Sequence, residues 1–311
     1  MNSHATNTLA GIIPPLSTPL TADGDVDVRS LERLVEHQLG AGVHGLFALG
    51  STGEVAFLRD EQRTQVIETT VRVAAGQVPV VAGLIDMTTP RVIAQLRRAE
   101  AVGADAVVAT APFYTRTHPA EVERHFRLIA DAADVPVIAY DLPVSVHTKL
   151  SAALLLELAA DGVLAGVKDS SGDDAGIRAL VLAARRLDRP FAVLTGSELT
   201  ADSALTFGAT GVVPGLGNVD PRGYVRLWEA TQRGDLVAAR EEQERLFGLF
   251  QLVNAGDSCR MGPASSALGA FKAALHLLGI IDCARTADPY IPLDDTEIAV
   301  VRERLEAAGL R

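Results

Sequence analysis

The sequence predicts a (β/α)8 barrel, or TIM barrel, followed by a C-terminal helical extension, and three observations support this fold class. Eight short apolar runs occur between residues 11 and 215, and segments with helical period separate them. Each run is nearly continuous in its hydrophobicity, as is typical of strands buried on both faces of a parallel sheet. The units recur every roughly 25–30 residues, and an open doubly wound sheet usually has fewer strands.

Local signals mark the ends of the expected strands and helices. Val135-Pro136 begins the fifth strand at a position where a missing backbone N–H costs little. Thr89 is expected to cap the helix that begins at Pro90, and Gly42 is expected just past the end of the first helix. The strand-like runs, in chain order, are residues 11–18, 45–50, 78–84, 105–112, 135–141, 162–168, 191–196 and 210–215.

Helical patterns continue after the last barrel unit, which ends near residue 232. Three amphipathic segments follow, and no Ser/Gly-rich linker separates them from the barrel. We therefore expect a (β/α)8 barrel over residues 1–232 and a helical extension over residues 233–311 that packs on it. The three segments span residues 235–253, 263–279 and 294–310.

Charge and composition exclude several classes of partner. The 311 residues include 28 basic and 39 acidic ones, a net charge of −11, so no nucleic acid or anionic membrane is expected as a partner. A small anionic substrate is not excluded, because the local charge of the site decides that. Cys259 and Cys283 indicate free thiols in a reducing compartment. With neither a signal-peptide pattern nor a long apolar helix, the sequence predicts a cytoplasmic protein.

Catalytic groups of such barrels follow the carboxyl ends of the strands, so these positions are the candidates for chemistry. After the second run, Gly50 and Gly53 enclose Ser51 and Thr52. A tight turn of this kind exposes backbone N–H groups that can hold a carboxylate or a phosphate. The same four residues can equally be the start of a helix that binds no ligand.

A lysine and two tyrosines end other runs. Lys168 ends the sixth, where partial desolvation favours the neutral amine, a nucleophile for ketones. Tyr140 ends the fifth, where it could relay protons beside a Schiff-base lysine, and Tyr114 follows the fourth. Each has a plainer interpretation, a surface lysine or a core aromatic. Their joint occurrence at strand ends favours a catalytic site.

Several metal and cofactor patterns are incomplete. Asp23, Asp25 and Asp27 alternate as in a calcium loop, but the glycine is at position 24 and not at the sixth position of the loop. Residues 215–217 lack the third glycine of a dinucleotide fingerprint, and the seven histidines show no metal-ligand spacing. The sequence therefore predicts neither a metal nor a cofactor.

The strand-end motifs resemble those of the dihydrodipicolinate synthase / N-acetylneuraminate lyase family of Schiff-base aldolases and lyases. The resemblance covers nearly the whole chain, in motifs that agree in order and spacing. It implies a (β/α)8 barrel with a helical extension, usually assembled as a homotetramer built from dimers. The motifs are GIIPPLSTPLTADGDVD, GLFALGSTGE, APFYTRT, PVIAYDLP, GVKDSSGD, GATGVVPGLGN and the closing DDTEIAVVRERL.

The resemblance also implies a role for each candidate residue. Lys168 would form an imine with the keto carbon of pyruvate or another 2-oxo acid, and Tyr140 would pass protons to and from it. Ser51 would connect Tyr140 to Tyr114, which in this family typically reaches in from the neighbouring subunit. The N–H groups of Ser51 and Thr52 would hold the substrate carboxylate.

Two further positions, Gly196 and Val213, would line the same pocket according to the resemblance. The sequence departs from the family pattern at two others. Dihydrodipicolinate synthases carry a carboxylate-binding arginine five residues after the strand-five tyrosine, and here that position is Ser145. Asp141 replaces the usual asparagine, and it could either favour a charged Lys168 or repel a second carboxylate.

The resemblance and the missing arginine favour a class I pyruvate aldolase that acts on a 2-keto-3-deoxy sugar acid. One alternative is a dehydratase that uses the same imine but releases water, and another is a dihydrodipicolinate synthase proper. A non-enzyme alternative is a barrel that serves as a small-molecule sensor. A metal-dependent aldolase is disfavoured, because no set of histidines and carboxylates occurs at the strand ends.

Overall fold

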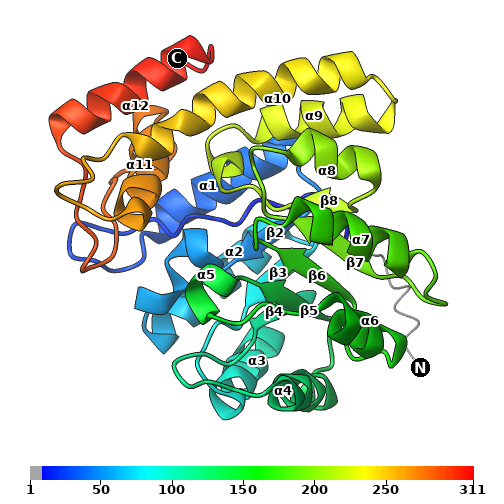
Figure 1. Ribbon diagram of the computed structural model, residues 1–311. Coiled ribbons are helices and arrows are strands. Elements are labelled where there is room, and N and C mark those ends of the chain that lie inside the picture. The colour runs from blue at the N-terminus through cyan, green and yellow to red at the C-terminus, as the bar shows by residue number, and fades with distance from the viewer. Residues whose placement is uncertain (1–8) are drawn as a thin grey trace.

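Eight parallel strands pair in the order β1-β8-β7-β6-β5-β4-β3-β2, with helices packed around them (Figure 1). The computed structural model describes residues 9–311. All eight predicted strands are present, and each is shorter than its apolar run because the run continues into a buried loop. The strands are β1 Gly11–Ile12, β2 Leu46–Ala48, β3 Val80–Gly83, β4 Ala106–Thr110, β5 Val137–Asp141, β6 Gly166–Asp169, β7 Ala192–Thr195 and β8 Gly211–Val212.

The chain that follows β1 closes the sheet into a barrel. The N–H of Leu16 donates to the carbonyl of Phe47 over 2.9 Å, and the N–H of Phe47 donates to the carbonyl of Pro14 over 3.0 Å. Pro15 and Phe47 form a parallel bridge. The strand itself is only two residues long, since the prolines at 14 and 15 have no N–H to donate to a ladder. The (β/α)8 fold class predicted from the sequence is confirmed.

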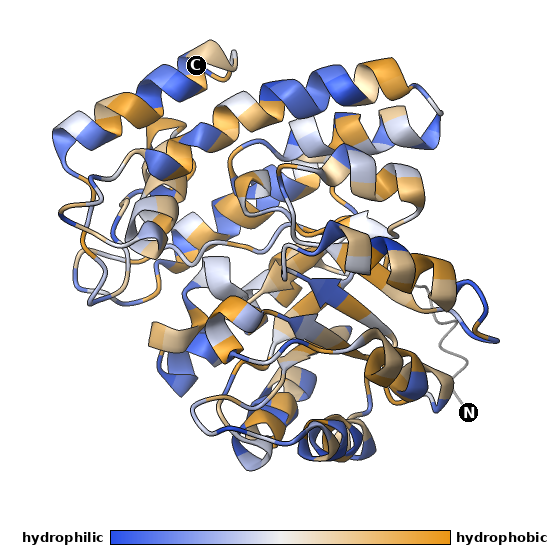
Figure 2. Ribbon diagram, viewed as in Figure 1, coloured by the Kyte–Doolittle hydropathy of each residue, from blue (hydrophilic) through white to orange (hydrophobic). Residues whose placement is uncertain are grey.

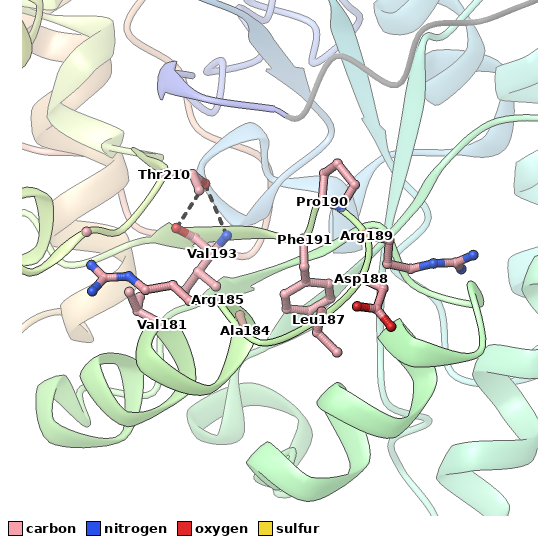
Figure 3. A pocket seen from close by; sticks show the side chains of 11 residues that line it. Val181, Ala184, Arg185, Leu187, Asp188, Arg189, Pro190, Phe191, Val193 and Thr210 are labelled. Atoms are coloured by element: carbon pink, nitrogen blue, oxygen red, sulfur yellow. Dashed lines mark hydrogen bonds between the residues drawn. The ribbon is translucent and has the colours of Figure 1, made fainter.

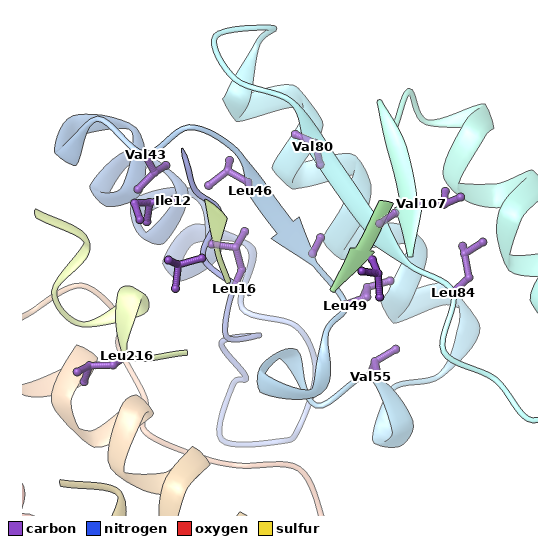
Figure 4. Packing of buried hydrophobic residues seen from close by; sticks show 14 of the residues in the cluster. Ile12, Leu16, Val43, Leu46, Leu49, Val55, Val80, Leu84, Val107 and Leu216 are labelled. Atoms are coloured by element: carbon purple, nitrogen blue, oxygen red, sulfur yellow. The ribbon is translucent and has the colours of Figure 1, made fainter. Parts of the chain in front are cut away.

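Side chains alternate between the barrel interior and the layer beneath the helices, as the two-residue period of a strand requires. Phe47, Val108 and Ile138 belong to a buried cluster inside the barrel. Their neighbours in the sequence, such as Leu46 and Val107, belong to a second cluster shared with the helices, part of which Figure 4 shows. Burial on both faces accounts for the unbroken apolar runs in the sequence.

Each strand leads into at least one helix, and short 3-10 turns occupy the loops η1 Ser51–Gly53, η2 Val55–Phe57 and η3 Gly215–Asn218. Gly42 caps the first helix with a φ of 82°, as expected. The expected cap at Thr89 is wrong by one residue, because Thr88 is extended and Thr89 already begins the helix. The helices are α1 Val28–Ala41, α2 Asp60–Ala74, α3 Thr89–Ala101, α4 Pro119–Ala132, α5 Pro143–Val146, α6 Ala152–Ala160, α7 Asp174–Ala184, α8 Ala201–Phe207 and α9 Pro221–Gln232.

After α9 the chain forms further helices at the side of the barrel (Figure 1): α10 Leu236–Phe250, η4 Gln251–Asn254, α11 Pro263–Leu277 and α12 Asp295–Ala307. Helix α10 packs along α9, and α11 packs on η4, α12 and η3. Figure 2 shows that α10 and α12 carry both polar and apolar residues, as expected of helices with one buried face. In residues 9–311, no helix is long and apolar enough to cross a membrane.

Candidate active site

Lys168 and Tyr140 lie side by side at the carboxyl ends of two adjacent strands. They are register partners in the β5–β6 ladder, and both side chains point into the barrel. Lys168 is 5% exposed, and its Nζ lies 3.8 Å from the centroid of the Tyr140 ring and 5.3 Å from that of Phe47. The amine is therefore held between two aromatic faces, at the end of the barrel where this fold places its chemistry.

The Tyr140 hydroxyl lies 3.4 Å from the Ser51 Oγ. Burial by itself raises the pKa of Tyr140, but the charge of Lys168 and hydrogen bonding by Lys168, Ser51 and Ser170 outweigh burial, so the pKa is lowered. A phenol with a lowered pKa gives up its proton more readily than an ordinary tyrosine. The arrangement thus suits Tyr140 to proton transfer beside the amine.

Ser51 and Thr52 begin the one-turn 3-10 helix η1, so their N–H groups have no acceptor within that helix. A Cβ at Gly50 would lie 2.9 Å from the Phe47 ring, and one at Gly53 would lie 2.9 Å from a backbone carbonyl. Both glycines are therefore required for the close packing of the turn. The turn both begins a helix and presents free N–H groups suited to a carboxylate.

Gly196 and Val213 lie at the ends of β7 and β8. The Gly196 N–H donates to the Asp169 carbonyl over 2.7 Å, and a Cβ at this glycine would lie only 2.2 Å from the Ser170 Oγ. Val213 is buried and borders the same interior cavity as Lys168. Both residues are thus near the amine, and only a residue without a side chain fits at position 196.

Tyr114 does not join the other candidates within one chain. Its side chain is 89% exposed, and no hydrogen bond connects it to the rest of residues 9–311. Its φ of 74° is uncommon for a residue with a large side chain and indicates local backbone strain. Any contact with the site must therefore involve a Tyr114 from another copy of the chain.

Asp141 points away from Lys168, because it follows the inward-pointing Tyr140 on the same strand. Its carboxylate contacts the Lys149 ammonium and accepts a hydrogen bond from the Leu150 N–H over 3.0 Å. The Lys149 Nζ also lies 3.3 Å from an Asp169 carboxylate oxygen. Burial lowers the pKa of Lys149, but the two carboxylates more than offset it, so its pKa is raised. Asp141 is thus neutralised outside the barrel and does not face the substrate pocket.

Glu198, two residues after Gly196, is a candidate that the sequence reasoning missed. Its carboxylate accepts a hydrogen bond from the Leu216 N–H and lies 3.5 Å from the Tyr224 hydroxyl. Burial raises the pKa of Glu198 to about 7, although the Leu216 N–H, the charge of Lys168 and the Tyr224 hydroxyl act to lower it. Its position just past the seventh apolar run was the signal that could have identified it.

A cavity of about 400 Å³ lies at the opposite end of the barrel (Figure 3). It is bordered by the end of α7 and by the segments that lead into β7 and β8, with Arg185, Phe191 and Thr210 among its lining residues. None of the predicted site residues borders it. The cavity therefore lies apart from the chemistry.

Comparison with known proteins decides the family. The sequence profile described as "Dihydrodipicolinate synthetase family" matches residues 8–308. The chain belongs to the dihydrodipicolinate synthetase family. The family resemblance stated from the strand-end motifs is therefore confirmed, and so is the prediction of a lyase, since the family acts through a lysine Schiff base.

Relatives align with the chain over almost its full length. A 4-hydroxy-tetrahydrodipicolinate synthase of Gluconacetobacter diazotrophicus is 32% identical over 98% of this chain and 99% of its own. Another, from Laribacter hongkongensis, is 34% identical over 97% of this chain and 99% of its own. The crystal structure of YagE, a prophage protein of this family from E. coli K12, in complex with pyruvate, superposes with a TM-score of 0.91 at 29% identity, covering 97% and 99% of the two chains.

Proposed function

We propose that this member of the family is a class I aldolase that cleaves a 2-keto-3-deoxy sugar acid into pyruvate and an aldehyde. The observation that carries the proposal is the placement of the Lys168 amine against Tyr140, whose hydroxyl lies next to Ser51. A nucleophilic amine, a phenol with a lowered pKa and a carboxylate-binding turn are the groups that such a reaction needs. The pyruvate complex of the E. coli relative supports the choice of a 2-oxo acid.

The reaction begins when the neutral Lys168 amine attacks the keto carbon and the carbinolamine loses water to give a protonated imine. Tyr140 then removes the proton of the C4 hydroxyl, the C3–C4 bond breaks, and the imine nitrogen takes up the electron pair as an enamine. The aldehyde leaves, the enamine carbon is reprotonated, and water hydrolyses the imine to release pyruvate and the free amine. Tyr140 is the acid and base in these steps because its hydroxyl lies beside the amine.

The remaining predicted residues bind and shape the substrate in this proposal. The N–H groups of Ser51 and Thr52 hold the carboxylate of the 2-oxo acid, since they have no acceptor in their own helix. Gly196 and Val213 shape the pocket wall. Tyr114 completes the relay from a neighbouring subunit, which its exposure in a single chain supports.

The homotetramer implied by the family, the cytoplasmic location and the division into a catalytic barrel of residues 1–232 and an extension of residues 233–311 belong to the same proposal. An assembly is supported by the exposed and strained Tyr114, which has no function within one chain. The division is supported by the end of α9 at Gln232, after which the chain no longer adds strands to the barrel.

The choice of a sugar acid rests on Ser145, which is exposed on α5 at the site's rim. A hydroxyl cannot make the bidentate contact that an arginine makes with a second carboxylate. A polyhydroxylated substrate tail needs no such partner. The names of the relatives favour a second candidate, 4-hydroxy-tetrahydrodipicolinate synthesis, in which pyruvate condenses with an aldehyde that carries its own carboxylate.

A panel of 2-keto-3-deoxy acids separates these functions, with pyruvate release and product mass as readouts and Lys168→Ala as the control. Pyruvate release that the control abolishes supports the aldolase. Loss of water without pyruvate release indicates the dehydratase. Turnover only of pyruvate with aspartate semialdehyde indicates the synthase. Ligand binding that survives Lys168→Ala, with no turnover of any substrate, indicates a sensor and contradicts the proposal.

A further inference from the structure

Glu54, the last residue of the GSTGE segment, makes a fully buried ion pair with the helical extension. Its side chain follows directly after the turn of Ser51 and Thr52, and its carboxylate contacts the Lys272 ammonium of α11. Both residues are 1% exposed. The pair thus connects the turn that we assign to the substrate carboxylate with a helix that lies outside the barrel.

Backbone groups of the extension complete the coordination of both charges. The second carboxylate oxygen of Glu54 accepts a hydrogen bond from the Ala287 N–H over 2.5 Å, and the Lys272 Nζ donates to the Arg285 carbonyl over 2.7 Å. All these partners come from α11 or from the segment between α11 and α12. The turn is therefore anchored to two separate parts of the extension.

Aromatic contacts hold the same segment on either side of the ion pair. The ring of Phe57 packs against that of Tyr290, with centroids 4.6 Å apart. The Phe271 ring, next to Lys272 on α11, lies beside Gly215, where an added Cβ would be 3.0 Å from this ring and 3.4 Å from the Thr52 Oγ1. The extension therefore packs against the turn itself as well as against the residues after it.

The backbone at Glu54 explains why the anchor matters. Glu54 has a φ of 57°, in the left-handed region that residues with a side chain seldom adopt, and it joins η1 to η2. Such a conformation persists only when the surroundings hold it. A buried ion pair is a poor source of stability, because the desolvation of both charges offsets their attraction, but it enforces one geometry.

We propose that Lys272 is a positioning residue that orients the Ser51 and Thr52 N–H groups toward the substrate carboxylate by holding Glu54. The helical extension is then part of the carboxylate-binding site, although it contributes no atom that contacts substrate. The inference rests on the proposed function, because it assigns the turn to the carboxylate of the 2-oxo acid.

Two ketones that differ in the carboxylate separate positioning from a general loss of structure. Pyruvate and acetone both form an imine with Lys168 that borohydride traps, but only pyruvate uses the turn. Lys272→Met should raise the pyruvate concentration that half-saturates trapping by at least tenfold and leave the rate of acetone trapping within twofold of wild type. The double variant Glu54→Gln/Lys272→Met removes both buried charges and tests the same point if the single variant does not fold.

Arg260→Met is the matched control, because Arg260 pairs with Glu297 within the extension, away from the turn. It should leave the trapping of both ketones unchanged. Equal losses with pyruvate and acetone in the Lys272 variants, or an unchanged response to pyruvate, would overturn the positioning role. Wild-type protein that traps neither ketone at Lys168 contradicts the proposed function instead, so the two failures are distinguishable.

Discussion

Lys168 and Tyr140 are direct register partners on adjacent parallel strands, and the Lys168 Nζ lies 3.8 Å from the centroid of the Tyr140 ring. Parallel pairing at the barrel end brings together two residues that are distant in the sequence, and the backbone alone determines their proximity. Because both side chains are buried, the amine and the phenol meet without competing water. This geometry is the basis of the predictions below.

Tyr140→Phe removes the hydroxyl that we assign to proton transfer and keeps the ring over the amine. The expected result is a fall in kcat of about 100-fold to 10,000-fold with little change in KM, since general acid–base catalysis contributes on this scale. Steady-state kinetics of pyruvate release measure both constants. A variant with full kcat would show that another group moves the proton.

Lys149→Met leaves the buried carboxylates of Asp141 and Asp169 side by side without their cation. We expect a loss of about 2 kcal/mol in the free energy of unfolding at pH 7, less than for a fully buried pair because Lys149 is partly exposed. Adding Asp141→Asn to this variant should recover part of the loss by removing one charge. Urea denaturation measures all three proteins, and identical midpoints would contradict a role for the cluster.

His125 makes stability fall in acid. Burial lowers the pKa of His125 from 6.5 to about 4, although a hydrogen bond to the Thr110 carbonyl opposes the shift. The unfolded chain therefore binds a proton more readily than the folded one, so stability is fully present above pH 6.5 and declines as pH falls to 4, by about 3 kcal/mol. His125→Gln should flatten this part of a plot of unfolding free energy against pH. An unchanged slope would exclude His125 as its source.

Glu198 acts in the opposite direction. Its folded pKa of about 7 lies above the ordinary 4.5, so the folded protein holds this proton more tightly than the unfolded chain does. The contribution to stability is present below pH 4.5 and is lost as pH rises to 7. Glu198→Gln should therefore raise Tm relative to wild type more at pH 8 than at pH 5. A difference in Tm that does not vary with pH would contradict the shifted carboxyl.

The fold and the centre of the site could be predicted because their signals are local. Apolar runs identify all eight strands, and the last inward-pointing residues of β5 and β6 are Tyr140 and Lys168. The outward direction of Asp141 also follows from strand alternation once Tyr140 points inward. Its pairing with Lys149, however, depends on how the loop after α5 folds back, and no periodicity indicates that.

Other contacts escape sequence reasoning because they join distant segments. Glu54 and Lys272 look like ordinary charged residues, and only the packing of α11 on the turn buries them together. The raised pKa of Glu198 depends on its burial near Leu216 and Tyr224, which belong to other loops and helices. Tyr114 is the converse, a residue that the motif identifies but that one chain leaves exposed.

The central claim is that Lys168 forms a Schiff base with a 2-oxo acid. Borohydride reduction in the presence of pyruvate, followed by peptide mass spectrometry, tests it most directly. The account predicts one reduced pyruvate adduct per chain on the peptide that contains Lys168, and no adduct in Lys168→Ala. An unmodified Lys168 in the wild-type protein, or an adduct located on another lysine such as Lys149, would contradict it.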